Sequence, residues 1–383
     1  MEVDLPAIAR NARLVHRVAG VRLLPMVKAN GYGLGMVPIA RALARALEPE
    51  TLHGFGVAAV SEGETLREAG WEGRIAVLAT PPPSELARAA AAGLELALSS
   101  VAEVAAWGQH GTPDRPVRFH LEVDTGMGRA GIAADAIDRW LPLLRSVVEE
   151  GALEWAGCFT HFHSADEPDL GATDRQHARF RAVREAIEVG KKPIRPAVYH
   201  CSNSAAALRR SGYGGDLVRP GIALYGGHVG AEPVPEPAVS VRGRLSLVRE
   251  LAPGSTVGYG ATYRTPGRQR IGTVAIGYGD GIRRALWPGG GEALVHGRRV
   301  PVVGRVSMDM TTVDLTGVPE AAPGDVVTFL GADGEESIGV DEVADRCDTI
   351  SYEILTGLTA RLPRIHLAGD DAPAGDASSA WTT

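Results

Sequence analysis

The sequence predicts an α/β protein in which a (β/α)8 TIM barrel, residues 1–230, precedes a C-terminal all-β domain, residues 238–367. Over the first part of the chain, apolar β-branched runs alternate with amphipathic helical segments, and eight such runs are what a closed barrel requires. The alternation stops at the proline-rich segment 230–237, which is typical of a linker. Short runs with strand alternation, separated by Gly and Pro, follow it. A doubly wound open sheet is the alternative for the first half.

The expected barrel strands are short apolar runs bounded by glycine, proline or polar residues. They are residues 21–28, 54–60, 74–79, 94–98, 117–123, 155–162, 197–201 and 217–224. Several of the helices expected between them begin with Ser or Asp at an N-cap position and end near Gly. These helices include residues 36–47, 61–69, 84–92, 134–149 and 174–189.

The segment after the linker is expected to form mainly strands, because its apolar residues alternate over short distances. The strands are residues 239–251, 270–276, 293–295, 299–303, 311–315 and 326–330, with helical segments at 338–347 and around 350–361. Residues 368–383 contain few large apolar side chains, so we expect a disordered tail there.

Composition excludes several classes of protein. The chain has 383 residues, of which 45% are hydrophobic and 22% charged, and its net charge of -7 argues against a nucleic-acid partner. No run approaches the roughly 18 apolar residues of a membrane span, and the N-terminus carries acids where a signal peptide carries bases, so a cytoplasmic location is expected. Three isolated cysteines suggest neither a disulfide framework nor a CxxC metal site.

Chemically useful side chains fall repeatedly at the expected carboxyl ends of the barrel strands, which is where such barrels place their active sites. They are Lys28, Glu122, Asp124, Arg129, His161, His163, Asn203, Ser204 and Arg219. A lysine at a buried strand end loses its proton more readily than a solvated one, so Lys28 is a candidate nucleophile toward a carbonyl group. His161 and His163 lack a third ligand at metal spacing, so no metal site is expected.

A set of motifs, in order along nearly the whole chain, resembles the alanine racemase family. The motifs are residues 28–33, 124–131, 160–162, 203–206, 219–226, 258–263, 276–281, 304–309 and 350–353. The resemblance implies a pyridoxal 5'-phosphate enzyme of fold type III, with the barrel and the β-domain in one chain. It also implies interconversion of L-alanine and D-alanine, which supplies D-alanine for peptidoglycan.

The resemblance implies two acid/base groups, because racemisation removes a proton from one face of a carbon and returns one to the opposite face. Lys28 matches the lysine that holds the cofactor and serves the D-face, and Tyr259 matches the base of the L-face. His161 matches a histidine that couples this tyrosine to the arginine matching Arg219. That arginine faces the ring nitrogen of the cofactor and, since it cannot accept a proton, leaves the nitrogen unprotonated.

The remaining site residues are also assigned by resemblance. The cofactor phosphate is expected to meet Tyr32, Ser204, the amides of Gly221 and Ile222, and Tyr352. The substrate carboxylate is expected to meet Arg129 and the backbone amide of Met308, while Tyr278 narrows the entrance and Asp309 supports the site from behind. In the family, Tyr259, Tyr278 and Met308 come from the partner subunit. The resemblance therefore implies a homodimer with two shared active sites.

One position departs from the family pattern. Relatives usually carry a carbamylated lysine two residues before the Asp that matches Asp124, and its anion fixes the arginine that matches Arg129. This chain has Glu122 there. Our hypothesis is that the carboxylate of Glu122 replaces the carbamate and holds Arg129.

Two other functions remain possible for a chain with these motifs. A basic amino-acid decarboxylase or a broad-specificity racemase would share the fold, but a decarboxylase needs no opposed tyrosine and usually places an acid at the ring nitrogen. A non-enzymatic pyridoxal-phosphate homeostasis protein would typically consist of the barrel alone. The preference for alanine over serine or larger substrates is left open by the sequence.

Overall fold

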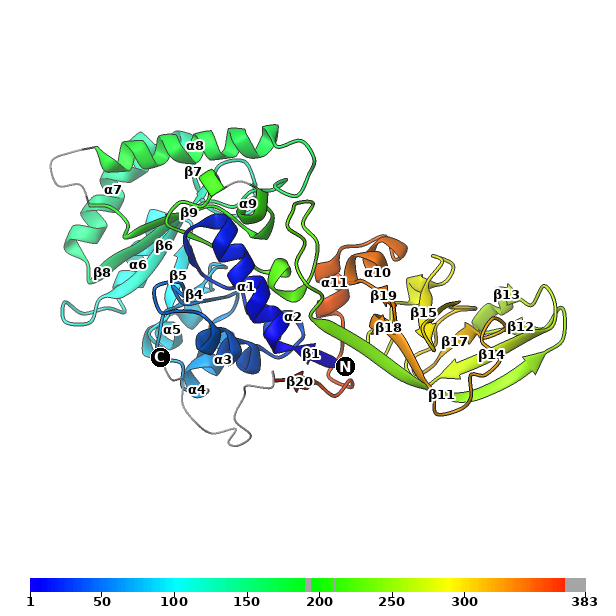
Figure 1. The fold of residues 1–383 in the computed structure, drawn as a ribbon. Coiled ribbons are helices and arrows are strands. Elements are labelled where there is room, and N and C mark those ends of the chain that lie inside the picture. Colours follow the sequence, from blue (N-terminus) through cyan, green and yellow to red (C-terminus); the bar gives the residue numbers. More distant parts are fainter. Residues whose placement is uncertain (190–193, 210, 369–383) are drawn as a thin grey trace.

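The computed structural model describes residues 1–189, 194–209 and 211–368, and the chain forms a helix-clad barrel beside a smaller β-rich region (Figure 1). Apart from Ala368, the tail expected to be disordered lies outside the described residues. Within the described ranges, no helix combines the length and the apolar character that crossing a bilayer requires.

Eight strands line the barrel, and all neighbouring pairs in their ladders are parallel. They are β2 (Arg22–Leu23), β3 (Phe55–Val57), β4 (Ile75–Val77), β5 (Glu95–Leu98), β6 (Val117–Asp124), β8 (Leu153–Phe159), β9 (Val198–His200) and β10 (Leu217–Val218). Strands β3 to β9 form one sheet, and β10 pairs with β2. An isolated parallel bridge from Met26 to Gly56 joins the β2 segment to β3, and an isolated antiparallel bridge from His200 to Gly215 joins β9 to the segment that precedes β10. The ring is therefore closed, and the predicted barrel is confirmed.

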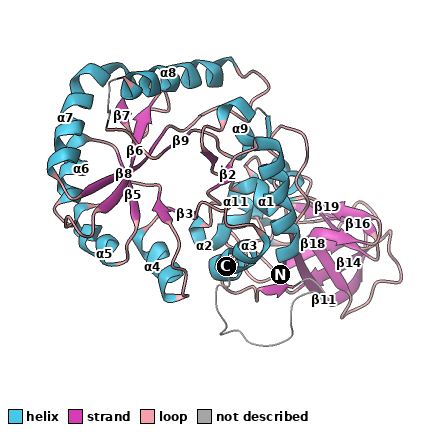
Figure 2. Cartoon of the chain, turned by 60° about the vertical axis from the view of Figure 1, so that its left-hand side comes forward, coloured by secondary structure: helices cyan, strands magenta, loops and turns pink. Residues whose placement is uncertain are grey.

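Helices cover the outside of this ring (Figure 2). They are α3 (Met36–Ala46), α4 (Val60–Glu68), α5 (Leu86–Ala91), α6 (Val101–Gly108), α7 (Ile137–Glu150), α8 (Gly171–Glu188) and α9 (Ser204–Arg209), and a short strand β7 (Ile132–Ala133) pairs with β6. Helix α3 shows the pattern: Met36, Ile39, Ala40 and Leu43 are buried at a spacing of three and four residues, so one face of the helix lies in the core, where it contacts α1 (Leu5–Ala19) and α2 (Lys28–Tyr32).

Two predicted strands are much shorter than the sequence indicated. The ladder of β2 ends at Leu23 because Pro25 has no N–H to donate, and Met26 adds only a single bridge. Likewise, β10 ends at Val218, and after Pro220 the segment Ile222–Tyr225 forms a 3-10 helix, η4, instead of the predicted strand. Both segments that carry predicted site residues, at Lys28 and at Gly221, therefore leave the sheet early and lie in irregular backbone.

The first 19 residues form a strand and a helix that the sequence patterns did not reveal. Strand β1 (Glu2–Asp4) pairs with β11 (Val239–Leu251) and β20 (Ile365–Leu367), so the start of the chain joins the sheet of the β-rich region. Helix α1 (Leu5–Ala19) begins where the Asp4 carboxylate accepts the Ala7 amide at 2.8 Å.

The β-rich region is built on the long strand β11, which reaches from the barrel into the sheet (Figure 1). Its other strands are β14 (Gln269–Val274), β15 (Glu292–Val295), β16 (Arg298–Pro301), β17 (Thr311–Asp314), β18 (Val326–Asp333) and β19 (Glu336–Ile338), with a separate hairpin of β12 (Thr256–Val257) and β13 (Tyr263–Arg264). Helices α10 (Val340–Arg346) and α11 (Ser351–Thr356) return toward the barrel, where α11 contacts α2 (Lys28–Tyr32).

Candidate active site

Lys28 opens a turn of left-handed backbone that occupies the carboxyl end of the first barrel segment. Ala29, Asn30 and Tyr32 have φ values of 51°, 53° and 55°, and Gly31 lies between them at 63°. Left-handed helical backbone costs a non-glycine residue roughly 1–2 kcal/mol. Strain of this kind persists only where the surroundings impose it, and it is concentrated at functional sites.

Glu62, on α4, holds the start of this turn. Its Oε1 accepts the Ala29 amide at 2.6 Å, and its Oε2 accepts the amides of Ala58 and Ala59 at 2.8 and 3.2 Å. On the other side of the turn, the Asn30 carbonyl accepts the Gly35 amide at 2.8 Å. The lysine is therefore presented by a segment that is tied at both ends, and Glu62 is a site residue that the sequence patterns missed.

The amine of Lys28 has no hydrogen bond or ion pair with any side chain among the described residues. Burial lowers its pKa from the ordinary value, the positive charge of Arg129 lowers it further, and the charge of Glu62 partly opposes both. Lys28 lines a pocket of about 290 Å³ together with Tyr32 and, from α11, Tyr352. A lysine whose pKa is lowered and whose amine has no partner is a better nucleophile than a solvated lysine, because more of it is unprotonated at a given pH.

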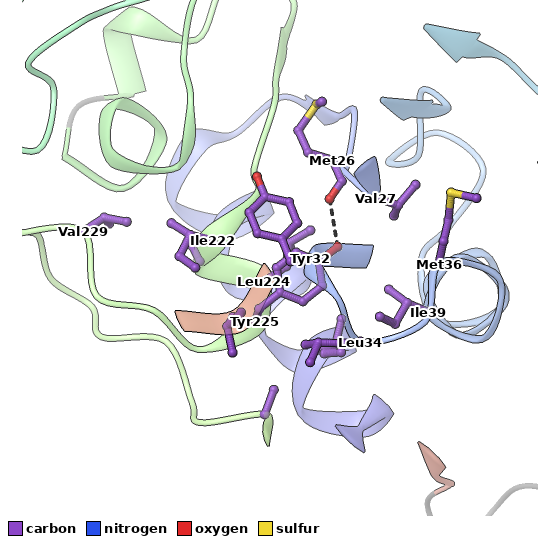
Figure 3. Close-up of a cluster of buried hydrophobic side chains, with 14 of the residues drawn as sticks. Met26, Val27, Tyr32, Leu34, Met36, Ile39, Ile222, Leu224, Tyr225 and Val229 are labelled. Carbon is purple, nitrogen blue, oxygen red and sulfur yellow. Dashed lines mark hydrogen bonds between the residues drawn. The ribbon is translucent and has the colours of Figure 1, made fainter. Parts of the chain in front are cut away.

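The residues expected at the phosphate come together around η4. Ser204 Oγ accepts the amide of Gly221 at 2.8 Å and that of Ala223 at 3.4 Å. A Cβ on Gly221 would lie 2.1 Å from Tyr32 Oη, so only glycine lets the tyrosine hydroxyl approach this backbone. The Tyr32 ring also packs on Tyr225, whose hydroxyl donates to the Met26 carbonyl (Figure 3).

Arg219 is a buried cation, 4% exposed, surrounded by acceptors. It contacts His200 Nδ1 at 2.7 Å through Nη1, and its Nη2 donates to the Thr160 carbonyl at 2.9 Å. His161 Nδ1 lies 3.3 Å from the same Nη2. Burial lowers the pKa of His161 to about 3, and the charges of Arg219, Arg129 and Lys28 act in the same direction, so His161 is neutral. The predicted coupling between His161 and Arg219 is thus present.

Arg129 is exposed on the loop after β6, and Glu122 is buried on that strand. Burial raises the pKa of Glu122, while the charges of Arg219 and then Arg129 oppose the effect. Among the ion pairs of the described ranges, none joins Glu122 to Arg129. The hypothesis that this carboxylate holds the arginine stays a prediction.

Three predicted site residues, Tyr259, Tyr278 and Met308, have exposed side chains and are not among the residues that line the pocket at Lys28. Tyr259 is 69% exposed in the short turn between β12 and β13, at the end of the β-rich region remote from the barrel (Figure 1). Tyr278 and Met308 are 41% and 52% exposed and lie on adjacent loops joined by backbone hydrogen bonds. Asp309 pairs with Arg361, which also holds Asp280. A single chain therefore presents these side chains outward rather than to its own lysine.

Known proteins resemble this chain over almost its full length. The family models "Alanine racemase, N-terminal domain" and "Alanine racemase, C-terminal domain" match residues 3–229 and 238–366. The alanine racemase of Desulfosudis oleivorans is 37% identical over 97% of both chains. The crystal structure of alanine racemase from E. faecalis is 35% identical, covers 96% of this chain and 97% of its own, and superposes with a TM-score of 0.87. The structure from Bartonella henselae, described with covalently bound pyridoxal phosphate, is 29% identical, covers 96% and 98%, and has a TM-score of 0.84. With both domains matched in order on the closed barrel and its β-rich partner, the chain belongs to the alanine racemase family.

Proposed function

We propose that this protein is a pyridoxal-phosphate-dependent racemase that interconverts L-alanine and D-alanine with two opposed acid/base groups. One observation carries the proposal: Lys28 is half-buried, its amine has no partner among the described residues, and burial and the nearby charges of Arg129 and Arg219 lower its pKa. We propose that its product is D-alanine for cell-wall peptidoglycan, made in the cytoplasm.

The residues at the site suit the cofactor. Lys28 would hold it, and the close approach of Tyr32 Oη to the Gly221 backbone beside Ser204 forms a cradle of donors suited to a phosphate group. A buried arginine, Arg219, is available for an unprotonated ring nitrogen, which can only accept a hydrogen bond. When bound, pyridoxal phosphate supplies an electron sink that makes the α-hydrogen of an amino acid acidic.

The chain's own groups then move the protons. Lys28 Nζ takes or returns the α-proton on one face of the substrate, and Tyr259 Oη does so on the other. Because Tyr259 is exposed and remote from Lys28 of the same chain, the proposal requires a second copy whose Tyr259 reaches this lysine. A homodimer with two shared active sites meets this requirement, since a two-fold axis presents each patch to the other copy.

The substrate carboxylate is assigned to Arg129 and to the amide of Met308. The two N–H groups of a guanidinium match the two oxygens of a carboxylate. Arg129 is exposed on the loop after β6, so its guanidinium is accessible to a ligand. Tyr278, beside Met308, would limit the size of the side chain that enters from the partner's side. Alanine is the substrate we propose.

Isotope exchange tests this function. The purified protein, loaded with the cofactor, is incubated with L-alanine in deuterium oxide, and α-deuterium and the enantiomer ratio are measured with time. We expect deuterium to enter as D-alanine forms, and Lys28→Ala to abolish both signals. L-serine and L-ornithine are run in parallel, so that a broad racemase is recognised. Absence of exchange with every amino acid would refute the proposal.

A further inference from the structure

A file of buried polar side chains leads away from Arg219 through the barrel interior, and the proposed chemistry does not use it. After the contact of Arg219 with His200 Nδ1, His200 Nε2 lies 3.0 Å from His120 Nδ1, and His120 Nε2 lies 2.9 Å from Glu95 Oε2. These side chains come from three strands, β9, β6 and β5. Barrel interiors are normally filled by layers of branched apolar side chains, so this file calls for an explanation.

The far end of the file is an ion-pair cluster at the opposite mouth of the barrel. Glu95 begins β5, and its Oε1 pairs with Arg74 at 2.8 Å and Arg118 at 3.0 Å, whose side chains are about one-third exposed. Burial alone would raise the pKa of Glu95, but the hydrogen bond from His120 and the positive charges of Arg74 and Arg118 lower it to about 2. Glu95 is therefore a carboxylate, which can only accept hydrogen bonds.

The two ends of the file fix the position of every proton between them. Arginine only donates, so His200 Nδ1 must carry a lone pair and its single proton lies on Nε2. His120 Nδ1 must then accept from His200, and the proton of His120 lies on Nε2, facing Glu95. A second proton on either ring would set donor against donor. All the hydrogen bonds therefore run in one direction, from Arg219 to Glu95.

Apolar and backbone features are arranged around this file. The Phe159 ring stacks on His200 at 5.0 Å with an interplanar angle of 5°, and the Arg219 guanidinium carbon lies 5.2 Å above the same ring. Gly157 stands opposite His120 in the β6–β8 ladder, and a Cβ there would lie 2.1 Å from His120 Nδ1. The room for the histidine pair depends on that glycine.

We propose that Glu95 and His120 are positioning residues for Arg219, and that they hold His200 in the tautomer that accepts a hydrogen bond from the arginine. The proposal rests on the function proposed above, in which Arg219 serves the cofactor. In the other tautomer, a proton on His200 Nδ1 would face an N–H of Arg219 across 2.7 Å. The guanidinium would have to move, together with its bond to the Thr160 carbonyl.

Substitution of Glu95 by glutamine should reverse the direction of the hydrogen bonds between this position and His200. The two arginines at Oε1 are donors, so the amide oxygen would turn toward them and the amide nitrogen toward His120 Nε2. His120 would then carry its proton on Nδ1, and His200 would carry its own on the nitrogen that faces Arg219. Arg74→Gln is the matched control, because it weakens the ion pairs of the same carboxylate and leaves the histidines in their original direction.

Neutron diffraction from deuterated crystals of the cofactor-loaded protein reads the tautomers without any assay of activity. We expect deuterium on Nε2 of both His120 and His200 in the unaltered protein and in Arg74→Gln, and on Nδ1 of both in Glu95→Gln. Deuterium on His200 Nδ1 in the unaltered protein would overturn the proposal. Because this readout needs no turnover, a failure of the racemase function is recognised separately, by the exchange experiment.

Kinetics and the absorption spectrum of the bound cofactor give the second readout. In Glu95→Gln we expect kcat to fall on the order of tenfold to a hundredfold, with a smaller change in KM and a changed spectrum, as when a supporting residue behind a ligand is removed. His120→Phe should lose as much, and His120→Gln, which keeps a donor and an acceptor, should recover part of the loss. An equal fall of kcat in Glu95→Gln and Arg74→Gln, with unchanged spectra, would show that Glu95 and His120 only support the structure, and would contradict the proposal.

Discussion

Glu62 is the residue whose substitution tests most sharply how the lysine turn is held. The turn contains three non-glycine residues in left-handed backbone, which together cost roughly 3–6 kcal/mol. The Glu62 carboxylate accepts three backbone amides around it. In Glu62→Gln, the single amide oxygen can face Ala29 or the Ala58–Ala59 pair but not both. At least one hydrogen bond to a charged group is lost, so we expect the free energy of unfolding to fall by about 1.5–3 kcal/mol.

The same substitution should change the chemistry of Lys28 in a defined direction. The negative charge of Glu62 raises the pKa of the lysine, so its removal lowers that pKa further. Binding of pyridoxal phosphate to the protein freed of cofactor should then reach half its maximal rate at a lower pH. Urea unfolding and stopped-flow absorbance measure the two effects. The control is Glu64→Gln. Glu64 lies on the same helix as Glu62 and pairs at the surface with Arg88 of α5, so its substitution should change neither the unfolding free energy nor the pH midpoint. An unfolding free energy and a pH midpoint equal to those of the unaltered protein would refute the reasoning.

Three further predictions concern other parts of the site. Gly221→Ala should lower the melting temperature, because its Cβ meets Tyr32 Oη, and Tyr32→Phe in the same chain should restore part of the loss; additive effects would contradict this. The contribution of His161 to stability should fall as the pH drops from 6.5 toward about 3, since unfolding lets this histidine take up a proton that the folded protein excludes, with a slope of at most about 1.4 kcal/mol per pH unit; His53, whose pKa burial also lowers to about 3, adds a slope of the same sign. In His161→Phe, the free energy of unfolding should depend less on pH in this range, and an unchanged pH dependence would contradict the assignment to His161. Glu122→Gln should lower activity by misplacing Arg129, which steady-state kinetics with L-alanine would show; unchanged kinetics would dismiss the hypothesis.

Most of the fold could be predicted because its signals are local. Strand β11 matches the predicted residues 239–251 to the residue, and α3 differs from its prediction by one residue at its end. Helix α1 was missed although its signals were present, with Asp4 as N-cap, a proline in the first turn and Gly20 at φ 68° as C-cap. The pairing of β1 with β20, more than 360 residues later, has no local signal.

The site could be predicted only where a motif carried it. Lys28, His161 and Arg219 were predicted, and the structure places His161 and Arg219 within hydrogen-bonding distance and both cations close enough to lower the pKa of the histidine. Glu62, Glu95 and His120 were not, since each acts through distances that only the closed barrel creates. Two signals were visible, Glu95 inside the apolar run 94–98 and His120 inside the run 117–123, because a buried polar side chain needs a partner. The turn after Lys28 contains Asn30 and Gly31, which adopt left-handed backbone more readily than other residues, but Ala29 and Tyr32 rarely do, so its left-handed conformation over four residues could not be predicted.

Subunit complementation tests whether the active site is built from Lys28 of one chain and Tyr259 of another. Lys28→Ala and Tyr259→Phe are each inactive in our account, but a hybrid dimer of the two contains one site in which both residues are intact. Unfolding and refolding an equal mixture should therefore restore racemisation of L-alanine to about a quarter of the unaltered activity, since about half of the dimers are hybrids with one intact site of two. A refolded mixture as inactive as its parents, although hybrids are present, would contradict the account.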